Sequence, residues 1–121
     1  MALIPLFLTH PGYAGHVADA ADDLRDNARV TLVCYYTAAL LLQRKYTERL
    51  ARLDLDVTPL PNLFGRELDL PESGSVEVAL HALGKRHAAL SGRPLNWYGT
   101  YEQAASRFIR RLELESTWAA N

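Results

Sequence analysis

Residues 30–36 read VTLVCYY and decide the fold that the sequence predicts. Every residue in this stretch is apolar, aromatic or β-branched, which is typical of a strand buried on both faces of a parallel sheet. Thr37 follows directly and has a side chain that can cap a helix. The stretch therefore predicts a central strand that leads into a helix.

Helical periodicity flanks this stretch on both sides. Apolar residues recur at helical spacing from about Ala14 to Asp26 and again from Ala38 to Leu53. A third helix is predicted between Ser75, which can cap it, and Gly92, which can end it. Its inner side is predicted to carry Val76, Leu80, Leu83, His87 and Leu90. A last helix is predicted around Tyr101, Ala105, Phe108 and Leu112.

Three further segments have the composition of strands: Leu3 to Thr9, Leu55 to Leu60 and Pro94 to Tyr98. Because strands and helices then alternate four times, the sequence predicts an α/β fold. We expect an open, mainly parallel sheet of about four strands with helices packed on it, a three-layer βα-repeat. Residues 1–121 form a single domain in this prediction.

Two observations favour a different layout. Pro5, Pro59 and Pro61 fall inside predicted strands, where proline removes a donor of the hydrogen-bond ladder. In addition, apolar residues from Ala21 to Leu53 keep one helical phase. A single long helix over this region is the alternative to helix, strand and helix.

Composition restricts the class of partner and the compartment. The chain has 13 Lys and Arg against 14 Asp and Glu, a net charge of −1, so charge does not predict an obligate nucleic-acid partner. Cys34 is the only cysteine, which excludes a disulfide within the chain and predicts a buried, unreactive thiol. No apolar run is long enough to span a membrane, and we expect a cytoplasmic protein.

The loop after the first predicted strand is the predicted site. His10 ends that strand, and ligands of parallel sheets bind at the carboxyl ends of strands. Gly12 and Gly15 lie between His10 and His16, so backbone amides at the start of the next helix could hold an anion. A strand-to-helix turn explains the same residues. No metal site and no cofactor are predicted, because His10 and His16 lack a third ligand at suitable spacing.

Two short motifs resemble the enzyme IIA domain of the mannose-family sugar phosphotransferase system. Phe7-Leu8-Thr9-His10 resembles the end of that family's first strand, and Asn62-Leu63-Phe64-Gly65 resembles its Asp-x-Phe-Gly-Gly loop. The resemblance implies a βα-repeat fold in which a histidine, here His10, accepts phosphate from a carrier protein. It places Asn62 beside the ring and the amides of Gly12 and Gly65 on the phosphate. Asn62 replaces the family's aspartate, and Arg66 replaces its second glycine.

Three functions follow from these observations. The first is a diverged phosphocarrier-like domain with His10 and Asn62 as catalytic residues and Gly12 and Gly65 as phosphate-binding residues. The alternative is a non-catalytic interaction or adaptor subunit of a complex. Its contact surface is formed by Arg107, Arg110, Arg111 and Trp118. The third is a small hydrolase or chelatase-like enzyme with His10 as general base. The first two require a protein partner, and a homodimer is compatible with them.

Overall fold

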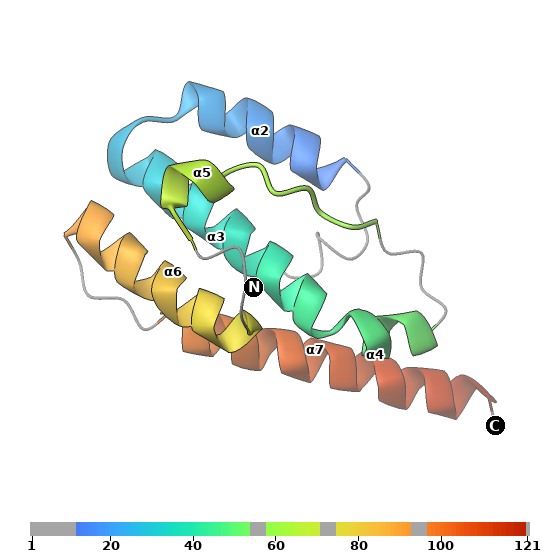
Figure 1. The fold of residues 1–121 in the computed structure, drawn as a ribbon. Coiled ribbons are helices and arrows are strands. Elements are labelled where there is room, and N and C mark those ends of the chain that lie inside the picture. Colours follow the sequence, from blue (N-terminus) through green and yellow to red (C-terminus); the bar gives the residue numbers. More distant parts are fainter. Residues whose placement is uncertain (1–11, 54–57, 71–74, 93–96, 121) are drawn as a thin grey trace.

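A computed structural model describes residues 12–53, 58–70, 75–92 and 97–120, and every regular element in these ranges is a helix (Figure 1). The first three helices are α2 (Tyr13–Asp23), α3 (Asp26–Lys45) and α4 (Thr47–Arg52). The short α5 (Gly65–Leu68) precedes two longer helices, α6 (Val76–Ser91) and α7 (Trp97–Ala120). α3 lies at the centre, with α2 on one side and α6 and α7 on the other.

The α/β prediction is wrong, because residues 30–36 lie within α3 and the described residues contain no strand. The centre of α3 is enclosed by the rest of the chain, and all residues from Tyr36 to Gln43 are buried. A helix buried all round loses the polar face that would reveal its period in the sequence. Packing also outweighs the modest helix penalty of valine and threonine, which is at most about 0.7 kcal/mol per residue.

The other predicted strands fare no better within the described residues. In the predicted strand Leu55 to Leu60, residues 58–60 have no regular structure, and residues 55–57 lie outside the described residues. In the predicted strand Pro94 to Tyr98, Trp97 and Tyr98 begin α7, and residues 94–96 lie outside the described residues. The strand at Leu3 to Thr9 lies outside the described residues. The alternative of one long helix is also wrong, since the chain breaks at Leu24–Arg25 and again at Tyr46. Asp26 has φ +55°, a left-handed conformation that aspartate tolerates better than most residues.

Local signals at α6 are confirmed. The Ser75 hydroxyl accepts a hydrogen bond from the Val78 amide at 3.2 Å, and Gly92 ends the helix at φ +72°. Leu83 and His87 are buried as predicted, whereas Leu90 is exposed. Thr37 does not cap a helix, because it lies within α3 and its hydroxyl donates to the Val33 carbonyl at 2.8 Å. Ser75 and Gly92, which flank an apolar periodic stretch, therefore marked the ends of a helix correctly. Thr37, which lies inside an apolar run, did not.

Residues 58–64, hereafter the 58–64 segment, are attached to α3 by side chains. Gln43 Nε2 donates to the Thr58 carbonyl at 2.9 Å, and Gln43 Oε1 accepts from the Leu60 amide at 2.8 Å. The Tyr36 hydroxyl donates to the Pro61 carbonyl at 2.7 Å, and the Tyr36 ring meets the Phe64 ring edge to face. The 58–64 segment is therefore fixed against α3 although it has no regular secondary structure.

Ion pairs join the outer helices to α3 and α4. Lys45 on α3 pairs with Glu102 on α7 and with Glu77 on α6. Arg49 on α4 pairs with Glu113 on α7 through two hydrogen bonds, at 2.6 and 3.1 Å. In the part of the chain that the structure describes, no helix has both the length and the apolar character needed to cross a membrane.

Candidate functional site

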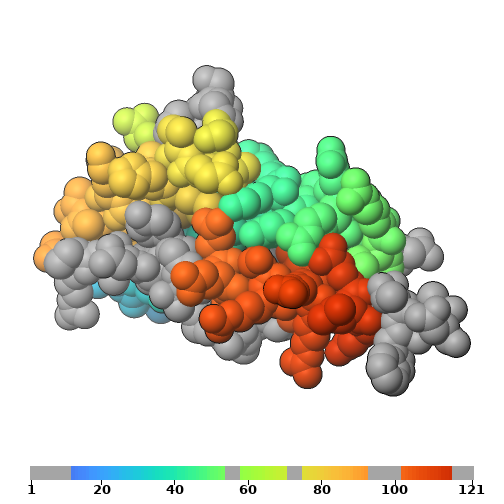
Figure 2. All heavy atoms as spheres, turned by 90° about the horizontal axis from the view of Figure 1, so that it is seen from below, coloured from blue at the N-terminus to red at the C-terminus, as the bar shows by residue number. Residues whose placement is uncertain are grey.

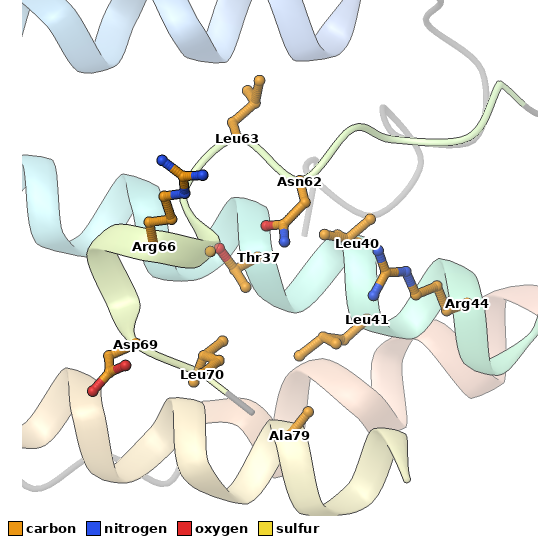
Figure 3. Close-up of a pocket in the computed structure, with 11 residues that line it drawn as sticks. Thr37, Leu40, Leu41, Arg44, Asn62, Leu63, Arg66, Asp69, Leu70 and Ala79 are labelled. Atoms are coloured by element: carbon orange, nitrogen blue, oxygen red, sulfur yellow. The ribbon is translucent and has the colours of Figure 1, made fainter. Parts of the chain in front are cut away.

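A groove of about 590 Å³ lies between α3, residues 62–70 and the start of α6 (Figure 3). Its α3 wall consists of Thr37, Leu40, Leu41 and Arg44. These positions share one face of α3, because residues three, four and seven apart lie above one another on a helix. The opposite wall consists of residues from Asn62 to Leu70, and Ala79 of α6 closes one side. We call this space the Arg44 groove.

The amide of Asn62 points from the 58–64 segment toward α3 (Figure 3). Gly65 makes this placement possible, since a Cβ atom on Gly65 would lie only 2.4 Å from Asn62 Nδ2. Any larger residue at position 65 would push the amide away. Asn62 and Gly65 therefore form one local unit within the Arg44 groove.

Two arginines give the groove its charge. Arg44 and Arg66 are both exposed, and among the described residues no carboxylate lies within ion-pair distance of either one. In Figure 3 the Arg44 guanidinium turns back over Leu40 toward the groove, and Arg66 extends along the rim on the side of Leu63. Asp69 is the acidic residue among the described lining residues, whose two arginines and one aspartate give a net charge of +1.

Neighbouring cations differ from these two arginines. Arg29 pairs with Glu67 and lies 6.0 Å from the centre of the Phe64 ring, while Lys45 pairs with two glutamates. Those carboxylates compensate their charge and fix their position. Arg44 and Arg66 keep their donors available to an incoming anion, and an arginine side chain can bind a carboxylate or phosphate through two parallel hydrogen bonds.

The structure brings together two of the four predicted site residues. Asn62 and Gly65 both line the Arg44 groove. Gly12 caps the N-terminus of α2, where its carbonyl accepts from the His16 amide at 3.0 Å, and it does not line this groove. His10 lies outside the described residues. Of the predicted set of His10, Gly12, Asn62 and Gly65, the structure therefore shows only Asn62 and Gly65 in one place.

The buried reactive side chains are remote from this chemistry. Cys34 is fully buried, as predicted, and burial raises the pKa of its thiol to about 12. His87 is also buried, and loss of hydration lowers its pKa below the usual 6.5. Neither residue lines the Arg44 groove. The described residues contain no group of three or more His, Cys, Asp or Glu side chains suited to a metal ion.

The two arginines are the residues that sequence reasoning missed. Arg44 lies in the helix predicted from Ala38 to Leu53, and its exposure there does not by itself indicate a groove. Arg66 was noted only as a departure from a family motif. A signal existed for Arg66, because it directly follows the predicted site residue Gly65 in the chain. No protein-family model, curated protein or solved structure matches this chain.

Proposed function

We propose that this chain is a non-catalytic binding module whose Arg44 groove holds an anionic group. The observation that carries the proposal is the presence of Arg44 and Arg66 in one groove without a carboxylate partner among the described residues. Two guanidinium groups on one concave surface favour a carboxylate or a phosphate over a neutral ligand.

Shape and polar groups support the same conclusion. The volume of about 590 Å³ lies within the usual range of ligand pockets. The Asn62 amide, which points into the groove, adds a neutral donor beside the charges. Because the hydroxyl of Thr37 already donates to Val33, it can serve the ligand as an acceptor only. These are groups that bind and orient an anion, and none of them is an activated nucleophile.

The phosphocarrier interpretation loses its structural basis. It requires a parallel sheet whose carboxyl edge presents His10, and the described residues form helices instead. The resemblance to a sheet-containing family therefore cannot explain why Asn62 and Gly65 lie together. A protein partner and a cytoplasmic location stay predictions.

The predicted contact surface on α7 is a weaker candidate for the site. Figure 2 shows α7 running across one face of the molecule, beside α6 and the end of the α3–α4 region. Arg107, Arg110 and Arg111 are exposed there, but Arg111 lies 3.5 Å from Glu115. Arg49, followed by Arg52 and Arg110, lowers the pKa of the Glu113 carboxyl. This surface mixes both signs of charge, so it attracts anions less than the Arg44 groove does.

Titration with small anions tests the proposal. Inorganic phosphate and acetate are added to the ¹⁵N-labelled protein at low ionic strength, and amide shifts are followed. We expect the largest shifts at Arg44, Asn62, Gly65 and Arg66. Each of Arg44→Gln and Arg66→Gln should weaken binding about tenfold, since a hydrogen bond to a charged group contributes about 1.5–3 kcal/mol.

Arg107→Gln is the matched control, because it removes the same charge from the exposed face of α7. It should leave anion binding nearly unchanged. If the three variants lose affinity equally, or if the shifts centre on α7, the Arg44 groove is not the anion site and the proposal is wrong.

A further inference from the structure

A second pocket, of about 420 Å³, lies beside the Arg44 groove, against the end of α3 and α4. The two spaces share Leu40 and Arg44, so Arg44 stands at their junction. The combined wall extends from Thr37 on α3 to Ala51 on α4. We call the second space the apolar pocket, for the lining described next.

The walls of the apolar pocket consist mainly of Leu40, Leu50, Ala51, Pro59 and Leu60. Leu50 and Leu60 are themselves buried and form a fixed surface, whereas Ala51 and Pro59 are exposed at the mouth. An alkyl chain that enters this pocket would remove mainly its own apolar surface from water, which stabilises a complex by about 25 cal/mol per Å² of apolar surface buried.

The polar side chains in this lining are already engaged. Gln43 bonds to both Thr58 and Leu60, and the Thr47 hydroxyl donates to the Gln43 carbonyl at 2.9 Å. Among the described residues of this lining, Arg44 is therefore the charged group, and it also lines the Arg44 groove. The combined site has a cationic end and an apolar end.

Building on the proposed anion-binding function, we propose that the ligand is a straight-chain aliphatic carboxylate. Its carboxylate lies on the guanidinium of Arg44, on the side of Asn62, and its alkyl chain passes over Leu40 into the apolar pocket. A single negative charge matches the net charge of +1 that the two arginines and Asp69 give the groove. A dianion would leave one of its charges uncompensated in this lining.

A series of acids of increasing length separates the two ends of the site. Acetate, butanoate, hexanoate and octanoate are titrated by calorimetry, with octanoate below its micelle concentration. Affinity should rise about two- to fourfold per added CH₂, because a fully buried CH₂ contributes about 0.8 kcal/mol. Octylamine, which has the same chain and the opposite charge, should bind at least tenfold more weakly than octanoate.

Two variants complete the experiment. Ala51→Gln places a larger polar side chain at the mouth of the apolar pocket, and Ala89→Gln is its control on the exposed face of α6. Ala51→Gln should flatten the dependence on chain length while leaving acetate affinity unchanged. Ala89→Gln should change neither, and circular dichroism verifies that both variants are folded.

The possible failures are distinguishable. If acetate binds in an Arg44-dependent manner but octanoate binds no more tightly, the aliphatic ligand is refuted and the anion-binding function stands. If no acid binds while phosphate does, the aliphatic carboxylate is refuted alone. If octanoate and octylamine bind equally well, or if neither the acids nor phosphate bind, the anion-binding function fails and the aliphatic carboxylate fails with it.

Discussion

Replacing Gln43 by leucine tests whether one buried amide holds the 58–64 segment on α3. Gln43 is 6% exposed, and its side chain bonds to the Thr58 carbonyl at 2.9 Å and to the Leu60 amide at 2.8 Å. Leucine has nearly the same helix propensity and a similar size, so α3 should keep its conformation. The variant removes both hydrogen bonds and little else.

The cost of Gln43→Leu follows from what each partner does afterwards. Thr58 is exposed, so its carbonyl can bond to water and loses little. Leu60 is buried, and an unsatisfied buried amide costs about 1–3 kcal/mol. We therefore expect the free energy of unfolding to fall by about 2 kcal/mol. With a urea m-value of about 2 kcal/mol per M, the midpoint should fall by about 1 M.

Urea unfolding followed by circular dichroism at the helix band measures this midpoint. Gln103→Leu is the matched control, since Gln103 is exposed on α7 and the same substitution there should shift the midpoint little. Gln43→Leu should also weaken phosphate binding, because Asn62 is carried by the 58–64 segment. A midpoint within about 0.2 M of the wild type would refute this account of how that segment is held.

Three further predictions concern pH, reactivity and shape. Burial lowers the pKa of His87 in the folded state, so its contribution to the free energy of unfolding should be fully present above pH 6.5. As the pH falls from 6.5 to the folded pKa, the free energy of unfolding should decrease by at most about 1.4 kcal/mol per pH unit. Urea midpoints at several pH values should show this slope in the wild type and not in His87→Leu. Thiol reagents should label Cys34, with its pKa of about 12, only after unfolding, whereas rapid labelling of the native protein would contradict its burial. Gly65→Ala should displace the Asn62 amide and weaken phosphate binding, with little loss of stability. Gly15→Ala is the control, because a Cβ at position 15 meets open space. It should leave phosphate binding unchanged and stabilise α2 by up to about 1 kcal/mol.

What the sequence could predict was local. The cap of α6 at Ser75 and its end at Gly92 depend on hydrogen bonds and backbone angles within a few residues, and both were located correctly. The strand at residues 30–36 was wrong because its composition reports burial, and burial is common to a core strand and a central helix. The helical phase from Ala21 to Leu53 was the better guide, although it did not show the breaks at Leu24 and Tyr46.

The candidate site was harder to predict because its parts are distant in sequence. Asn62 and Gly65 were singled out through a family resemblance, and the structure places them together for a steric reason that the resemblance did not supply. Arg44 lies on α3 with two other basic residues, Arg29 and Lys45, and its own sequence context does not separate it from them. Only the position of residues 62–70 across α3 distinguishes Arg44 from its neighbours, and that position depends on long-range contacts of Tyr36 and Gln43.

Gln43 and Arg44 are adjacent in the chain but have different roles in this site. Gln43 maintains the shape of the site, and Arg44 supplies its positive charge. Gln43 points into the interior, fixes the 58–64 segment and uses its amide for two backbone groups, which leaves the apolar pocket without a free amide. Arg44 is exposed and bonds to no described carboxylate, so its loss should change binding and leave unfolding nearly unchanged. If Arg44→Gln destabilised the fold as strongly as Gln43→Leu, the guanidinium would stabilise the fold itself. It would then not be available to bind a ligand.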